Sequence, residues 1–181
     1  MKPTLLLCLA LTLGTDAFAH RLDECLQALR VSVTTNRIDF SFKLTPGTAV
    51  ADQLLAVIDK DRDGQFSARE VTAYIQRFLK DVRVKLDEKF LVLTETEASF
   101  PSLPEIKAGV GIIHIKATVS VAPLLAGNHT LSLTNAHLPA ISVYQVNALQ
   151  PKDRATKITK QTRDELQKSY RLEFSVSSST P

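Results

Sequence analysis

The stretch Ile38-Asp39-Phe40-Ser41-Phe42-Lys43-Leu44 alternates apolar and polar residues without a break. Successive side chains of a β-strand point to opposite faces of the sheet, so this alternation predicts a strand with one buried face. Residues 29–33 alternate in the same way, and Thr35-Asn36 between the two runs has the composition of a turn. The two runs therefore predict a β-hairpin.

The same period of two returns along most of the remaining chain. It predicts six further strands, at 82–86, 90–93, 113–121, 129–133, 143–149 and 171–176. Pro101 and Pro104 predict a loop over 101–107. About eight strands in one chain predict a mainly β fold, with two sheets packed as a β-sandwich.

A helical pattern interrupts the strands between 38–44 and 82–86. Before an acidic stretch, Leu54, Leu55 and Ile58 form one apolar stripe. After it, apolar residues recur at the spacing of a helix with one buried face: Val71, Tyr74, Ile75, Phe78 and Leu79. The pattern predicts a helix-loop-helix insertion over 48–80, starting just after Pro46-Gly47.

The connecting stretch, residues 59–70 (DKDRDGQFSARE), has the spacing of an EF-hand calcium loop. Calcium prefers six to eight oxygen ligands, and the loop offers them at regular positions. The predicted ligands are Asp59, Asp61, Asp63, the backbone carbonyl of Gln65, Ser67 directly or through water, and Glu70 through both oxygens. Gly64 stands where the chain must turn sharply, and Phe66 is expected to point into a core.

An acidic surface turn is the alternative interpretation of this stretch. It leaves unexplained why four acidic residues, Gly64 and Phe66 all fall in register. Lys60, Arg62 and Arg69 offset most of the carboxylate charge, so we expect a weak to moderate site. Extracellular EF-hand sites commonly have a Kd of about 10⁻⁴ to 10⁻³ M.

The N-terminus has the three regions of a secretory signal peptide. Lys2 precedes an apolar run over 5–13, and Ala17-Phe18-Ala19 forms a small-x-small cleavage site. The run is shorter than the ~20 residues that span a bilayer. We therefore expect cleavage after Ala19, a periplasmic or secreted protein without a transmembrane segment in the mature chain, one domain over 20–176, and a disordered tail over 177–181.

Other chemistry receives less support from the sequence. Cys8 leaves with the signal, and Cys25 remains alone, so we expect a half-buried thiol and no intramolecular disulfide. The net charge is only +3, and export argues against nucleic acid as a partner. No serine lies in a nucleophile elbow and no histidine has a partner at an informative spacing, so we expect no enzymatic activity.

A transition-metal site is a second hypothesis. Cleavage would make His20 the first residue, where its imidazole and the free α-amino group can together chelate nickel or copper. His129 and His137 could complete such a site if the fold brings them close. The simpler alternative is that His20 just follows the cleavage point.

Four pieces of the chain, the first at the predicted cleavage point, carry a family resemblance: residues 19–24 (AHRLDE), 44–47 (LTPG), 127–131 (GNHTL) and 142–149 (SVYQVNAL). With them the chain resembles the extracytoplasmic N-terminal domain of bacterial nickel/cobalt transporter-like and hydrogenase/urease accessory-type membrane proteins. The resemblance implies a location in the bacterial envelope and a stand-alone sensing or docking domain. The chain lacks the transmembrane helices of those proteins, so we expect no transport activity from it.

The leading functional hypothesis is an exported calcium-binding domain with a single EF-hand, in which the ion supports a binding or accessory role. An envelope protein or a membrane transporter would be its partner. The alternative is a periplasmic accessory protein that handles nickel or copper through His20.

Overall fold

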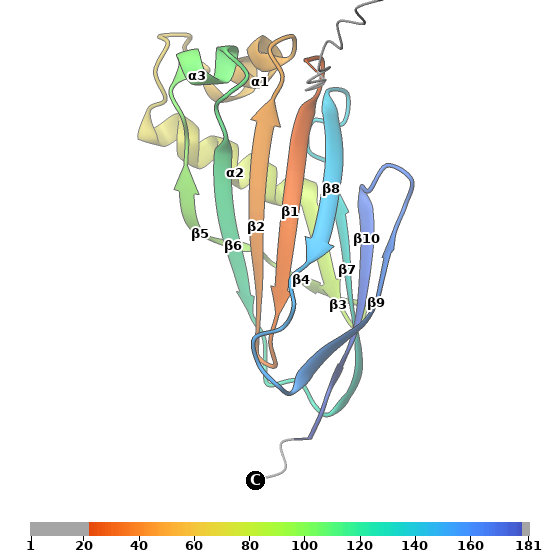
Figure 1. Cartoon of the computed structure of the whole chain (residues 1–181). Coiled ribbons are helices and arrows are strands. Elements are labelled where there is room, and N and C mark those ends of the chain that lie inside the picture. The colour runs from red at the N-terminus through yellow and green to blue at the C-terminus, as the bar shows by residue number, and fades with distance from the viewer. Residues whose placement is uncertain (1–21, 179–181) are drawn as a thin grey trace, which may run out of the picture.

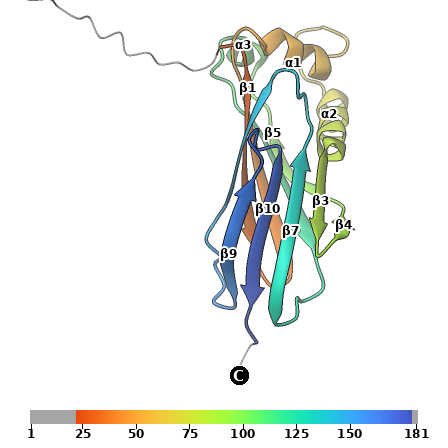
Figure 2. The ribbon, with the colours of Figure 1, turned by 90° about the vertical axis from the view of Figure 1, so that its right-hand side faces the viewer.

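The protein is a sandwich of two five-stranded β-sheets that face each other, with three helices at one end (Figures 1 and 2). This description comes from a computed structural model and covers residues 22–178. The predicted mainly β fold is confirmed. The predicted signal peptide and the end of the predicted tail, residues 179–181, lie outside the described residues.

The first sheet has the order β5-β6-β2-β1-β8 and the second has the order β4-β3-β7-β10-β9. The strands of the first sheet are β1 (Cys25–Val33), β2 (Arg37–Pro46), β5 (Thr94–Ser99), β6 (Ile113–Ser120) and β8 (Ser142–Ala148). Those of the second are β3 (Val82–Leu86), β4 (Lys89–Leu91), β7 (Gly127–Asn135), β9 (Thr156–Arg163) and β10 (Ser169–Val176). Strands β1 and β2 form the predicted antiparallel hairpin, and β8 pairs with β1 in parallel.

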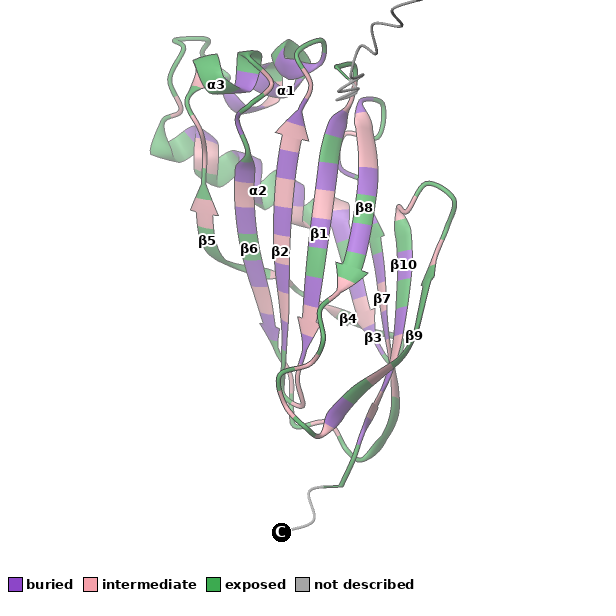
Figure 3. Cartoon of the chain, viewed as in Figure 1, coloured by how far each residue is buried: buried purple, intermediate pink, exposed green. Residues whose placement is uncertain are grey.

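The core lies between the two sheets, and alternate residues of the central strands are buried in it (Figure 3). Residues 38–44 follow this pattern, since Ile38, Phe40, Phe42 and Leu44 are at most 2% exposed. From the second sheet, Leu131, Leu172 and Phe174 are equally buried. Removal of these apolar side chains from water is the main source of stability for such a sandwich.

Two of the helices form the predicted insertion between the second and third strands. They are α1 (Ala51–Ile58) and α2 (Ala68–Asp81), and α2 runs directly into β3 (Figure 2). Helix α2 buries Tyr74, Ile75 and Phe78. The Phe78 ring meets that of Phe42 edge to face at 4.9 Å, so α2 packs on the same core as the first sheet.

Two edge strands were not predicted, and ten strands replace the expected eight. Strand β5 lies at the edge of the first sheet and β9 at the edge of the second. Most of their side chains are exposed, so neither segment shows the alternation that marks a strand with one buried face. The same reason accounts for β7 starting before the predicted 129–133, because its first two residues are exposed; the strand also continues to Asn135, which is buried.

The predicted loop over 101–107 is wrong, because it contains a short helix, α3 (Leu103–Lys107). Pro104 lies in its first turn, and the Glu105 carboxylate accepts the backbone N–H of Ser102 at 2.7 Å. Proline suits the start of a helix because the N–H that it lacks would have no partner there. The buried Ile106 anchors this turn against the core.

Two smaller expectations also change. Cys25 is completely buried instead of half-buried, and burial raises the pKa of its thiol to about 12. Ser177, placed in the predicted tail, donates its backbone N–H to the Ala155 carbonyl at 2.8 Å. Within residues 22–178, no helix combines the length and the apolar character needed to cross a bilayer.

Candidate metal centre

The loop between α1 and α2 brings together three carboxylates that were predicted from the sequence as metal ligands. Oxygens of Asp59, Asp61 and Asp63 all lie within 4.8 Å of one another. The loop turns through the left-handed region at Arg62 (φ 62°) and Gly64 (φ 83°). Glycine enters this region at no steric cost, and the double turn folds the chain back so that the three side chains converge.

Backbone amides of the loop orient each carboxylate. Gly64 N–H donates to Asp59 Oδ2 at 3.2 Å, Asp63 N–H to Asp61 Oδ1 at 3.2 Å, and Gln65 N–H to Asp63 Oδ1 at 2.8 Å. These bonds use one oxygen of each aspartate. The geometry of the cluster is therefore set by the loop backbone.

Asp59 differs from the other two aspartates because it is buried, with only 7% of its surface exposed. Its second oxygen, Oδ1, is buried and has no hydrogen-bond partner among the described residues. Burial of an unpaired carboxylate oxygen is unfavourable, and native proteins normally satisfy such groups. A cation among the three aspartates would supply the missing interaction, so the residues present fit a metal ion.

Glu70, the last predicted ligand, makes a different set of contacts. One of its oxygens accepts the Lys60 N–H at 2.6 Å, and the other accepts the Ser67 hydroxyl at 2.8 Å and the Ser67 N–H at 3.1 Å. The bond from the Ser67 hydroxyl and those from the backbone amides hold the Glu70 pKa below its usual value. Glu70 is thus ionised at neutral pH and closes the loop by linking its two ends.

Ser67 and Glu70 also start helix α2. The Ser67 hydroxyl accepts the Glu70 N–H at 3.3 Å while the Glu70 carboxylate accepts the Ser67 N–H, which is a capping box. Of the predicted ligands, the structure thus gathers Asp59, Asp61 and Asp63 into one cluster and pairs Ser67 with Glu70. Coordination by Ser67, Glu70 and the Gln65 carbonyl stays a prediction.

The donor atoms of the cluster indicate which ions it can hold. All are carboxylate oxygens, with no nitrogen or sulfur among them. Oxygen-only sites prefer hard cations such as Ca²⁺, Mg²⁺ and Mn²⁺ over nickel or copper.

Phe66 connects the loop to the rest of the protein. The Phe66 ring meets that of Phe100 at 6.0 Å between centroids, and Phe100 meets Tyr74 of α2 at 5.8 Å. Phe66 also packs against the main core. The loop is therefore attached to the sandwich as well as to its two helices.

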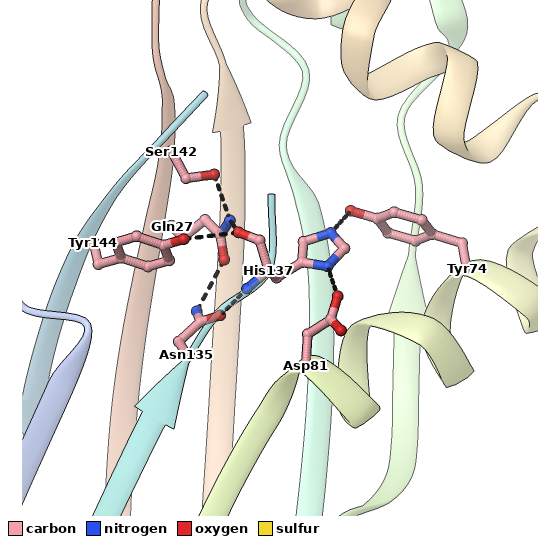
Figure 4. Close-up of polar contacts among 7 residues, drawn as sticks. All are labelled: Gln27, Tyr74, Asp81, Asn135, His137, Ser142 and Tyr144. Atoms are coloured by element: carbon pink, nitrogen blue, oxygen red, sulfur yellow. Dashed lines mark hydrogen bonds and ion pairs between the residues drawn. The ribbon is translucent and has the colours of Figure 1, made fainter. Parts of the chain in front are cut away.

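A buried polar network at the other end of α2 was not predicted (Figure 4). His137 is completely buried, with its Nδ1 2.8 Å from Asp81 Oδ2 and its Nε2 3.1 Å from the Tyr74 hydroxyl. Burial lowers the His137 pKa and raises that of Tyr74. The consistent assignment is a neutral imidazole that donates from Nδ1 to Asp81 and accepts at Nε2 from Tyr74.

The backbone of His137 links this pair to both sheets. The His137 carbonyl accepts from Gln27 Nε2 and from the Tyr144 hydroxyl, both at 2.8 Å. The His137 N–H donates to Asn135 Oδ1 at 3.0 Å, and Asn135 Nδ2 donates to Gln27 Oε1 at 2.9 Å (Figure 4). The network thus fastens the C-terminal half of α2 to β1, β7 and β8. Its members lie far apart in the sequence, so no local spacing marks it.

The structure does not bring His129 and His137 together for a transition metal. His129 lies near the start of β7 and His137 follows its last residue, Asn135; the six strand steps from His129 to Asn135 alone span about 20 Å at the usual rise per strand residue. Both ring nitrogens of His129 already have partners, Asp87 Oδ2 at 2.7 Å and the Leu125 carbonyl at 2.8 Å. His20 lies outside the described residues.

No protein-family model matches the sequence, and a comparison with curated proteins finds no match. The class of this protein is therefore described from its fold and its candidate site alone. The protein is a β-sandwich whose inserted helix-loop-helix carries an aspartate cluster that could hold a metal ion.

Proposed function

We propose that the protein is an exported calcium-binding domain with one EF-hand, in which Asp59, Asp61, Asp63, the Gln65 carbonyl, Ser67 and Glu70 supply the ligands. The unpaired, buried Oδ1 of Asp59 is the observation that supports this most strongly. A divalent cation would satisfy that oxygen and relieve the repulsion among three close carboxylates. Calcium is favoured over magnesium because the loop has the twelve-residue calcium spacing.

We assign the ion a structural role. The exit helix α2 is held at both ends, by the loop at Ser67 and Glu70 and by the His137 network at Tyr74 and Asp81. An ion at the loop would fix α1 relative to α2 and so stabilise the surface of the helical end. That surface would contact an envelope protein or a membrane transporter.

The test is calcium titration by isothermal calorimetry of the purified protein and of its Glu70→Gln variant. This change removes the charge of the bidentate ligand at nearly constant volume, and we expect binding to weaken at least tenfold. The matched control is Glu95→Gln, on the exposed edge strand β5, which should bind as the parent does. Absence of calcium binding by the parent at millimolar concentrations would refute the proposal.

A further inference from the structure

A groove of about 430 Å³ lies beside the loop that carries the aspartate cluster, between the end of α1 and the exposed side of α2. Its apolar lining residues are Val57, Ile58, Ala73 and Tyr74, of which Ala73 is exposed and Val57 half-buried, while Ile58 and Tyr74 lie beneath the surface. Sites for small molecules usually measure about 300–1,000 Å³ and are mostly apolar, with a few polar groups that orient the ligand. The groove has the size and lining of such a site.

Three cationic side chains also line the groove: Lys60, Arg69 and Arg77. Arg69 and Arg77 are eight residues apart on α2 with Ala73 midway, so all three lie on one face of the helix. The two arginines are exposed, and within residues 22–178 neither makes a hydrogen bond or an ion pair. Their guanidinium groups are therefore available to carboxylate, sulfonate or phosphate oxygens.

Two carboxylates, Asp61 and Glu70, belong to the same lining, but both are already engaged. Glu70 accepts backbone and hydroxyl donors of Lys60 and Ser67, and Asp61 belongs to the metal cluster. With three positive and two negative groups the groove carries a small positive charge. A divalent cation in the loop would be shared by four carboxylates, offset part of the charge of Asp61 and Glu70, and so make the groove more positive.

We propose that this groove binds a small organic anion with an apolar body. Its acidic group would lie between Arg69 and Arg77, and its apolar part would cover Ala73 and Val57. One consequence rests on the proposed function: calcium in the loop should tighten binding of the anion. By thermodynamic linkage, the anion should tighten binding of calcium by the same factor.

The experiment compares two fluorescent probes that share a ring system, anionic 8-anilinonaphthalene-1-sulfonate and neutral N-phenyl-1-naphthylamine. We expect the protein to prefer the anion, and the Arg69→Gln/Arg77→Gln variant to bind it at least tenfold more weakly with little change for the neutral probe. Ala73→Trp should weaken both probes because it fills the groove without changing its charge. Thermal unfolding of each variant verifies that it is folded.

The matched control is Arg83→Gln/Arg154→Gln, which removes two exposed arginines that also lack a hydrogen bond or ion pair within the described residues. It changes the net charge by the same amount away from the groove, and it should bind the anion as the parent does. Equal loss in both double variants, or equal affinity of the parent for the two probes, would overturn the proposal.

Calcium calorimetry on the same samples separates this inference from the proposed function. The protein could prefer the anionic probe through Arg69 and Arg77 and yet bind no calcium. That result would support the groove and refute the calcium site. Calcium binding without that selectivity would refute the groove alone. Bound calcium that leaves the affinity for the anion unchanged would overturn the coupling.

Discussion

Replacement of Asp59 by asparagine should change stability in opposite directions with and without calcium. Without the ion, Asp59 places a charge in a buried position, with Oδ1 unpaired and two carboxylates within 4.8 Å. The asparagine side chain would keep an acceptor for the Gly64 N–H but remove the charge. We expect a gain of about 1 kcal/mol in the free energy of unfolding, since most of the repulsion is screened near the surface.

With calcium, the parent should be more stable than the Asp59→Asn variant. Binding to the folded state alone stabilises it by about 2.7 kcal/mol at a hundredfold excess over Kd. For a domain of this size about 2–4 °C of melting temperature corresponds to 1 kcal/mol, so the parent should gain about 5–10 °C. Asp59→Asn should gain almost nothing, because it loses a ligand oxygen with its charge.

The assay is thermal unfolding of parent and variant, followed by circular dichroism in a calcium chelator and in excess calcium. The two melting curves should exchange their order between the conditions. Sodium chloride at the same ionic strength provides the control for general ionic effects. A variant that is destabilised equally in both conditions would show that Asp59 acts through packing, and the reasoning from its unpaired oxygen would be refuted.

Three further predictions concern the loop and the network behind it. Gly64→Ala meets no atom within 4 Å but must adopt φ +83°, so it should lose about 1 kcal/mol of stability and weaken calcium binding, measured by unfolding and calorimetry. Tyr74→Phe leaves Nε2 of the buried His137 unpaired and should lose about 1–3 kcal/mol in chemical denaturation, and an unchanged midpoint would count against the hydrogen bond. Because burial lowers the His137 pKa in the folded state, the unfolded state takes up the proton first as the pH falls. The free energy of unfolding should therefore decrease as the pH drops below about 6.5 and level off below the pKa of the folded state. Its dependence on pH should be weaker in His137→Gln.

The sequence could predict those strands in which the apolar residues are buried and the polar residues between them are not. Strand β2 was predicted because Ile38 and Phe40 are buried while Asp39 and Ser41 are not. Strands β5 and β9 lie at the sheet edges with both faces largely exposed, so no period distinguishes them from a loop. Only the pairing with a neighbouring strand makes them strands, and that pairing is a property of the tertiary fold.

The candidate site divides in the same way. The spacing of Asp59, Asp61 and Asp63 is local, and the loop backbone alone is enough to bring them together. His137 lies 56 residues from Asp81 and 63 from Tyr74, and nothing in the sequence around any of them indicates the contact. Its burial follows from how the end of β7 meets α2, which no local pattern contains.

The attachment of α2 bears on whether calcium could switch this domain between two conformations. Swinging α2 away from the sandwich would break the two side-chain hydrogen bonds of His137 and expose Phe78, which is completely buried. These losses amount to about 4–9 kcal/mol, from about 1–3 for each buried bond and about 1.5–3 for the ring.

A calcium site with a Kd of about 10⁻⁴ to 10⁻³ M supplies about 4–5.5 kcal/mol in total. A ligand shifts a conformational equilibrium only by its difference in affinity for the two states, so a site this weak would have to bind the open state alone to open the hand appreciably. The contacts of His137 therefore favour an ion that stiffens the helical end of the sandwich over one that opens it.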